Sequence, residues 1–122
     1  MPFRKEAGME KLEEKKYKTM VYICSPYAGD IEGNTAKAKK YCRWATDKGC
    51  IAIAPHLLFP QFMSEETERE ESLHNGMVLL GKCDELWVFG DTISSGMRAE
   101  IEKAEKYRKR IRYFSGEEAL CT

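Results

Sequence analysis

A glutamate on the edge of an apolar helix face is the residue of this sequence best placed to do chemistry. Residues 94–110 read SSGMRAEIEKAEKYRKR, and on a helical wheel Ile101 and Ala104 fall within about 40° of Met97. Glu100 falls about 60° from Met97, on the shoulder of that apolar stripe. Its carboxylate could act on a bound ligand. It could also serve only the helix, because acidic groups near a helix N-terminus contribute about 0.3–1 kcal/mol.

The elements that must position Glu100 are indicated by apolar runs that alternate with amphipathic stretches. Buried strands are expected at four short, continuous apolar runs, residues 19–24, 50–55, 84–89 and 111–114. Helices are expected between them, from the N-cap Asn34 to Gly49, from Ser64 to Cys83, and in the stretch that contains Glu100.

The order of these elements predicts an α/β fold. Strands of continuous rather than alternating hydrophobicity are typical of a parallel sheet covered on both faces. We therefore expect a three-layer sandwich with a mainly parallel, four- or five-stranded sheet in the order 2-1-3-4, of the Rossmann or flavodoxin-like type, with right-handed crossovers. Residues 1–17 are interpreted as a charged leader, 18–116 as the α/β domain and 117–122 as a C-terminal tail.

Three polar loops follow the expected strands and should meet at one edge of the sheet. They are SPYAGDIEGN at residues 25–34, PHLLFPQF at 55–62 and GDTISSG at 90–96. Ligands of open parallel sheets bind beyond the carboxyl ends of the strands, where the strand order reverses. The helix of Glu100 begins at this edge, so Glu100 is expected to point toward the crevice.

Composition argues against several classes of function. The 20 basic and 20 acidic residues of the 122-residue chain cancel, so no overall field recruits a membrane or nucleic acid, and neither partner is expected. Five cysteines without a CxxC pair and two histidines make neither a disulfide framework nor a zinc site. The glycine spacing fits neither dinucleotide nor P-loop motifs. We expect no metal and no cofactor, and a cytoplasmic location.

Three segments of the chain resemble one enzyme superfamily. YICSPYAGDIEGNTAKA, GCIAIAP and CDELWVFGDTISSGMRAEIEKA are similar to the nucleoside 2-deoxyribosyltransferase-like superfamily, and most similar to its short, often phage-borne members. The resemblance spans residues 18–114. Its most specific part is Ser94, Gly96 and Glu100 at the spacing S-x-G-x-x-x-E, and its second part is the S-P-Y after the first strand together with Asn34.

The resemblance implies a chemical role for Glu100. The matching glutamate of those enzymes is the nucleophile: it attacks the anomeric carbon of a nucleoside, expels the base and holds the sugar as an ester until a second base or water takes it. A helix N-terminus suits this role, because its amides stabilise an ionised carboxylate. The resemblance thus implies cleavage or (deoxy)ribosyl transfer at the N-glycosidic bond of a nucleoside or nucleotide.

Two positions depart from the pattern of those enzymes. Asn75 is the closest match to an aspartate that assists proton transfer or orients the nucleophile, and an amide does not exchange a proton near neutral pH. Ser94 stands where the transferases place an acidic residue. The alternative function is therefore a non-catalytic binding protein for a nucleotide or a nucleotide-derived signal.

The remaining candidate residues lie in the three loops. Besides the catalytic candidates Glu100 and Asn75, the predicted substrate-binding residues are Ser25, Tyr27, Asn34, His56, Asp91, Ser94, Ser95 and Gly96. Tyr27 could stack on a base or brace the sugar, or it could only pack. His56 could bind the ligand or its own loop. Asp91 could contact ribose hydroxyls or cap its turn.

A homo-oligomer is also expected. Leu73, Met77 and Leu80 form an apolar stripe on the helix predicted from Ser64, with Phe59 and Phe62 nearby in the sequence. This helix and loop are expected to pack against a second copy of the chain, as a dimer or a higher oligomer.

Overall fold

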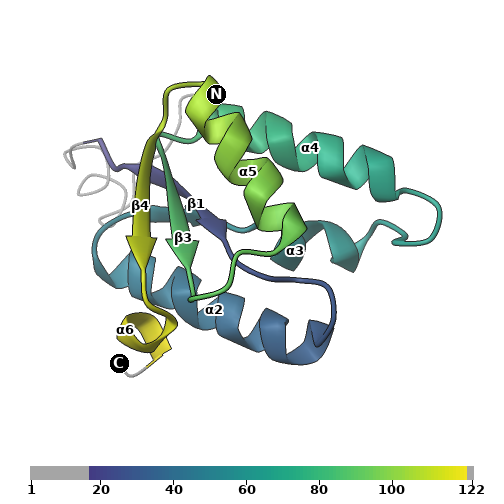
Figure 1. Ribbon diagram of the computed structural model, residues 1–122, viewed down its shortest axis with the longest axis horizontal. Helices are drawn as coiled ribbons and strands as arrows, with labels where there is room; N and C mark the ends of the chain where they lie inside the picture. The colour runs from purple at the N-terminus through teal and green to yellow at the C-terminus, as the bar shows by residue number, and fades with distance from the viewer. Residues whose placement is uncertain (1–16, 121–122) are drawn as a thin grey trace, which may run out of the picture.

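The four apolar runs form one parallel sheet in the computed structural model, which describes residues 17–120 (Figure 1). The strands are β1 Met20–Cys24, β2 Ile51–Ile53, β3 Glu85–Phe89 and β4 Arg110–Phe114. Their order is β2-β1-β3-β4, and every neighbouring pair is parallel. The predicted α/β class and the predicted strand order are confirmed.

Helices cover both faces of the sheet, which gives the expected three layers (Figure 1). In chain order they are α2 Ile31–Asp47, α3 Pro55–Leu58, the 3₁₀ turn η1 Phe59–Gln61, α4 Arg69–Lys82, α5 Ser95–Lys106 and α6 Gly116–Leu120. The elements α2 and α6 lie on one face, and α4 and α5 lie on the other. No helix among residues 17–120 has the length and apolarity needed to cross a membrane.

The sheet separates two cores, because successive side chains of a strand point to opposite faces. The face toward α2 carries a core rich in aromatic residues, which we call the aromatic core; its rings are those of Tyr41, Trp44, Trp87, Phe89 and Phe114. Its rings pack closely, with centroids 4.3 Å apart for Tyr41 and Phe89 and 4.9 Å apart for Trp44 and Phe114.

The face toward α4 and α5 carries a mainly aliphatic core. Its members are Tyr22, Cys24, Leu80, Cys83, Leu86, Val88, Met97 and Ala104, all of them buried. Met97 and Ala104 belong to the apolar stripe predicted for α5, and Ile101 packs against the same core. The shoulder position of Glu100 therefore brings its carboxyl group to the border between this core and the sheet edge.

The start of α2 differs from the sequence prediction. Asp30, not Asn34, is the N-cap, and its Oδ1 accepts a hydrogen bond from the backbone N–H of Gly33 at 3.0 Å. Asn34 lies inside the helix, where its side-chain amide donates to the carbonyl oxygens of Tyr27 and Ala28, both at 3.1 Å. Asp and Asn are equally good caps, and the loop carbonyls decide between them by engaging Asn34.

Two further boundaries are corrected. The segment after β2, predicted as a loop, is helical: Pro55 starts α3, which suits a residue with no N–H and a fixed φ. The helix predicted from Ser64 begins at Arg69 instead, because residues 64–68 form turns in which the Ser64 hydroxyl accepts from the N–H of Thr67 at 3.3 Å.

The two ends of the chain are described only in part. Residues 1–16 of the predicted leader, and residues 121 and 122 of the predicted tail, lie outside the described residues. The part of the tail that is described, up to Leu120, belongs to α6, which buries Ala119 against the α2 face.

Candidate functional site

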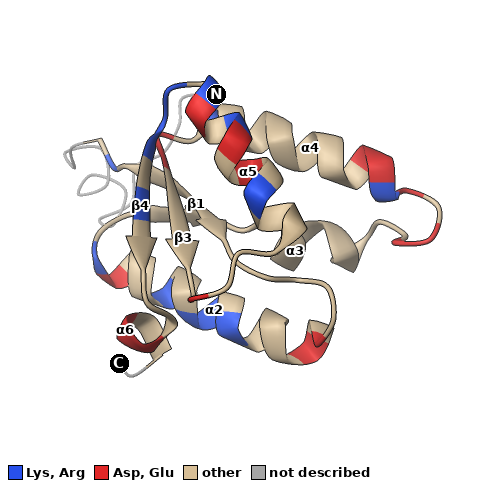
Figure 2. Ribbon diagram, in the orientation of Figure 1, with Lys and Arg blue, Asp and Glu red and all other residues tan. Residues whose placement is uncertain are grey.

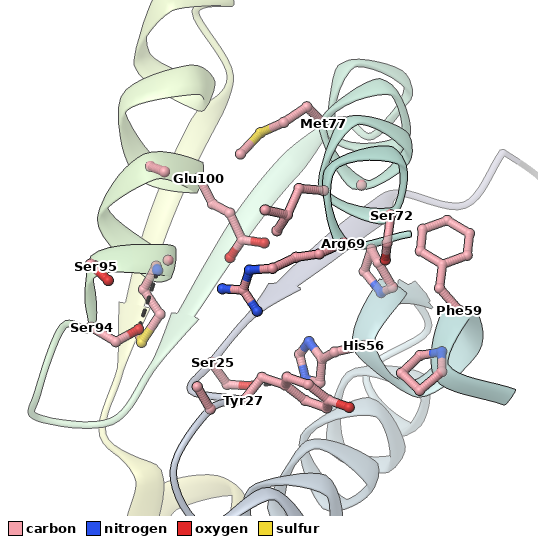
Figure 3. Close-up of a pocket in the computed structure, with 18 of the residues that line it drawn as sticks. Ser25, Tyr27, His56, Phe59, Arg69, Ser72, Met77, Ser94, Ser95 and Glu100 are labelled. Carbon is pink, nitrogen blue, oxygen red and sulfur yellow. Dashed lines mark hydrogen bonds between the residues drawn. The ribbon is translucent and has the colours of Figure 1, made fainter. Parts of the chain in front are cut away.

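A cavity of about 380 Å³ opens at the carboxyl ends of β1 and β3, between α3, α4 and α5 (Figure 3). These two strands are neighbours, and the chain order reverses between them, which is where ligands of such folds bind. The volume falls in the range of about 300–1,000 Å³ that is typical of small-molecule sites. The expected crevice is therefore present at the expected edge.

Glu100 is positioned by the first turns of α5. The hydroxyl of Ser94 caps the helix by accepting from the N–H of Met97 at 3.2 Å, and the buried Met97 side chain anchors the first turn to the core. Glu100 follows one turn later, half-buried, with its carboxyl group among the residues that line the cavity (Figure 3).

Tyr22 of β1 binds the carboxyl group of Glu100. Its hydroxyl donates a short hydrogen bond to Oε2 of Glu100. Burial, followed by the neighbouring Glu100, raises the pKa of Tyr22 far above its ordinary value, so the hydroxyl keeps its proton and stays a donor. The thiol of Cys24, buried beside them, also keeps its proton, because burial raises its pKa as well.

Burial raises the pKa of Glu100 from 4.5 to about 7, although the hydrogen bond from Tyr22 and the neighbouring thiol of Cys24 act in the opposite direction. Burial therefore brings the pKa of this carboxyl group close to neutral pH, far above that of an exposed glutamate. A carboxyl group that lies in a cavity and has a strongly raised pKa is typical of a group that takes part in catalysis.

His56 and Tyr27 form the opposite wall. The Nε2 atom of His56 lies 3.4 Å from the hydroxyl oxygen of Ser25, and the rings of His56 and Tyr27 are tilted with centroids 5.6 Å apart. Burial lowers the pKa of His56 to about 4, so its ring is neutral at pH 7. It can exchange hydrogen bonds with a ligand but contributes no positive charge.

The cavity brings together most of the predicted site residues. Those that line it are Ser25, Tyr27, His56, Ser94, Ser95, Gly96 and Glu100. Asn34 and Asp91 do not: they line a second cavity of about 230 Å³ beside α2, which also includes Ser25. Asn75 lines neither of these two cavities; Ser72 and Gly76 are the residues at that level of α4 that face the larger one.

Two residues of the site were not predicted. Tyr22 was assigned only to a buried strand, although a tyrosine within an apolar run signals that its hydroxyl needs a partner. Arg69 begins α4, and its guanidinium points into the cavity toward Glu100 (Figure 3). Figure 2 shows the acidic loop before α4 and the single basic segment at the start of the helix. A lone arginine within the run SEETEREE is the signal that could have identified it.

Among residues 17–120, no group of three or more His, Cys, Asp or Glu side chains is arranged to hold a metal ion. The side chains at this site are instead a carboxyl group, hydroxyls, a neutral imidazole and one guanidinium. Such a set can bind and act on a polar organic ligand.

Comparison with known proteins places this site on a known scaffold. A family model described as "Domain of unknown function (DUF7768)" matches residues 19–114. None of the curated proteins matches the chain in sequence. A solved 2-deoxyribosyltransferase from the psychrotolerant bacterium Bacillus psychrosaccharolyticus is similar in structure, with a TM-score of 0.60 and 21% identity over 80% of this chain and 72% of that chain.

A second solved structure, 2-desoxiribosyltransferase from Leishmania mexicana, has a TM-score of 0.62 and 15% identity. The alignment covers 80% of this chain and 64% of that chain, so the present chain spans less than two thirds of its length. The nucleoside 2-deoxyribosyltransferase-like fold implied by the sequence resemblance is thereby confirmed.

Proposed function

The chain belongs to the DUF7768 family, and from its 2-deoxyribosyltransferase-like fold we propose that it cleaves the N-glycosidic bond of a nucleoside or nucleotide, or transfers its (deoxy)ribosyl group, with Glu100 as the nucleophile. One observation carries this proposal: the Glu100 carboxyl group lies inside the larger cavity with a hydrogen bond from Tyr22. A glutamate that served only the end of its helix would gain more from full exposure to water, because burial disfavours its charge.

The proposed reaction proceeds in two displacements. The hydrogen bond from Tyr22 occupies Oε2 of Glu100, so Oε1 attacks the anomeric carbon while the bond to the base nitrogen breaks and the base leaves with the electron pair. Water supplies the proton that the departing base takes up. Water or a second base then attacks the same carbon and gives up a proton to the hydroxide that the first step left in solution, and the ester bond to Glu100 breaks to return the carboxylate. Two inversions retain the configuration of the sugar.

The substrate contacts are assigned to the walls of the cavity. Tyr27 and His56 present ring faces suited to a base, and Ser94, Ser95 and Gly96 surround the start of α5 beside the reacting carbon. Asn34 acts indirectly, since it holds the loop of Tyr27 through two hydrogen bonds.

Asp91 and Asn75 do not line the larger cavity. Asp91 stays a candidate for contact with a ligand that extends into the second cavity. Asn75 is given no role in proton transfer, because it does not line the larger cavity and its amide cannot exchange a proton near neutral pH.

The alternative is a binding protein for a nucleotide or a nucleotide-derived signal. One observation favours this alternative: the described residues that line the larger cavity include no strong proton donor for the departing base. His56 is neutral at pH 7, and the raised pKa of Tyr22 means that its hydroxyl does not readily give up its proton. Release of an unprotonated base is slower, and a protein that only binds has no need of the donor.

The two functions are separated by incubating the protein with a panel of nucleosides and nucleotides. We expect free base to appear by chromatography, and the intact mass of the protein to increase by one glycosyl group when the reaction is quenched early. Ligand binding without base release and without the mass increase would select the binding protein.

Activity should depend on pH through Glu100. Only the ionised carboxylate attacks, and burial raises its pKa to about 7, so kcat/KM should rise as the pH increases through about 7 and level off above it. Tyr22→Phe removes a hydrogen bond that lowers this pKa, so its profile should shift to higher pH. Initial rates between pH 5 and 9 test both expectations, and a profile independent of pH would contradict them.

We further propose that the 18–116 domain is cytoplasmic and forms a homo-oligomer through α4 and the preceding segment. Two side chains there are strongly exposed, Phe62 at 67% and Leu73 at 55%. The predicted contact surface is smaller than the sequence suggested, because Leu80 and Phe59 are buried within the protomer.

A further inference from the structure

The larger cavity has one cationic side chain. Of the described residues that line it, Arg69 alone carries a positive charge at neutral pH, because burial keeps His56 neutral. The acidic side chains of the lining are Glu65 and Glu100. This guanidinium lies among the hydroxyls and rings that line the cavity, and 64% of the side chain is exposed. A cation in this position indicates a ligand with an anionic group.

The present partner of Arg69 restrains it weakly. Its Nη1 lies 3.3 Å from Oε1 of Glu65, one turn earlier in the chain, and the two side chains are 64% and 46% exposed. Exposed pairs of this kind contribute little. A guanidinium has five N–H donors, and the contact with Glu65 engages one of its nitrogens. Figure 3 shows the group extending over the cavity toward Glu100, where a ligand anion can reach it.

Phosphate is the anion that best matches this position. The planar fork of an arginine binds two phosphate oxygens at once. Ser72 lies three residues after Arg69 on the same face of α4, is half-buried and lines the cavity, so its hydroxyl can donate to a third oxygen. The exposure of Arg69 also lets a phosphate keep part of its hydration, which avoids the cost of burying a charge.

The place of the phosphate on the substrate follows from the proposed function, on which this inference rests. With the anomeric carbon at Glu100 and the base against Tyr27, the 3′ and 5′ hydroxyls are the positions of the sugar that can carry a phosphate, and the 5′ hydroxyl, on an exocyclic carbon, extends farther from the ring. We propose that Arg69, with Ser72, binds the 5′-phosphate of the substrate, and that nucleoside 5′-monophosphates are preferred over nucleosides.

The test compares kcat/KM for base release from the four common 2′-deoxynucleoside 5′-monophosphates with that from the matching nucleosides. We expect the monophosphate to be preferred by about 100-fold, the effect of a charge-assisted pair of hydrogen bonds. Arg69→Gln should reduce this preference by about the same factor.

Arg43→Gln is the matched control, because Arg43 also forms an exposed i,i+4 pair, with Asp47 on α2, away from the cavity. It should leave the preference unchanged. The 3′-monophosphates form a further arm of the test, and equal preference for them would overturn the placement of the phosphate at the 5′ carbon.

The remaining outcomes separate this inference from the proposed function. Base release with no preference for monophosphates, or with a preference that survives in Arg69→Gln, overturns the inference and leaves the function standing. If no base is released from any compound, calorimetry decides: tighter binding of the monophosphates that is lost in Arg69→Gln supports the inference, while the proposed function fails. Equal binding of both sets, or no binding, overturns the inference together with the function.

Discussion

Glu100→Gln should lower kcat for base release by about 10⁴-fold or more, while the dissociation constant of the substrate changes little. The amide keeps the size of the side chain and can still accept a hydrogen bond from Tyr22, but it has no charge with which to attack a carbon atom. Base release is measured by chromatography and binding by calorimetry. Glu102→Gln, an exposed position on the same helix, is the matched control and should retain full activity.

The same substitution should change stability in a pH-dependent way. The pKa of Glu100 is 4.5 in its ordinary state and about 7 in the folded protein, so between these values the folded state holds a proton that the unfolded chain releases. The free energy of unfolding therefore falls as the pH rises from 4.5 to 7, by up to about 3 kcal/mol. Glu100→Gln removes this loss and should be more stable than the wild type at pH 8.

Urea denaturation at pH 5 and pH 8 measures this difference. The gain from Glu100→Gln should be small at pH 5, where the folded wild type already carries the neutral acid. If the variant is less stable than the wild type at pH 8 and retains its activity, the carboxylate is a structural group and the nucleophile assignment is wrong.

Phe89→Ala should destabilise the protein by about 3–5 kcal/mol, a large part of the roughly 5–15 kcal/mol that stabilises a typical domain. The ring of Phe89 is fully buried at the end of β3, stacks on Tyr41 at 4.3 Å and contacts Trp44 and Phe114 at 5.8 and 5.4 Å. Its removal leaves a void between α2 and β4, which carry these three rings.

Urea denaturation, monitored by circular dichroism, measures this decrease in the free energy of unfolding. Tyr113→Ala on β4 is the control, since 63% of that side chain is exposed, and it should cost less than about 1 kcal/mol. If Phe89→Ala also lowers the free energy of unfolding by less than about 1 kcal/mol, the aromatic core rearranges to fill the void and the prediction is wrong.

The fold could be predicted because the signals for it are local. Continuous apolar runs identify the strands, and their spacing requires helical crossovers, which together fix a parallel sheet. The first residue of a helix was less predictable where two nearby residues are both good N-caps. Asp30 and Asn34 both suit an N-cap, and the contacts of Asn34 with the carbonyls of Tyr27 and Ala28 exist only in the folded loop.

The site was predictable to the extent that it depends on one helix. The position of Glu100 at the cavity was predicted because its angle from the apolar stripe can be computed from the sequence, and its chemical role remains a prediction from the family resemblance. Tyr22 and Arg69 were not predicted to line the cavity because their positions depend on tertiary contacts. The hydroxyl of Tyr22 meets a residue 78 positions later, and Arg69 extends from the first turn of α4 toward the cavity. The separation of Asp91 from Glu100 into two cavities likewise depends on packing at the end of β1.

The division of the protein into two cores has a spectroscopic consequence. Both tryptophans of the chain, Trp44 and Trp87, lie in the aromatic core, and the larger cavity lies on the other side of the sheet, where its lining includes Tyr22 and Tyr27 but no indole. Tryptophan emission is thus an internal reporter of how the α2 face is packed, and a ligand in the cavity does not contact it. A change in tryptophan emission therefore reports a change in the packing of the α2 face and not direct contact with a ligand in the cavity.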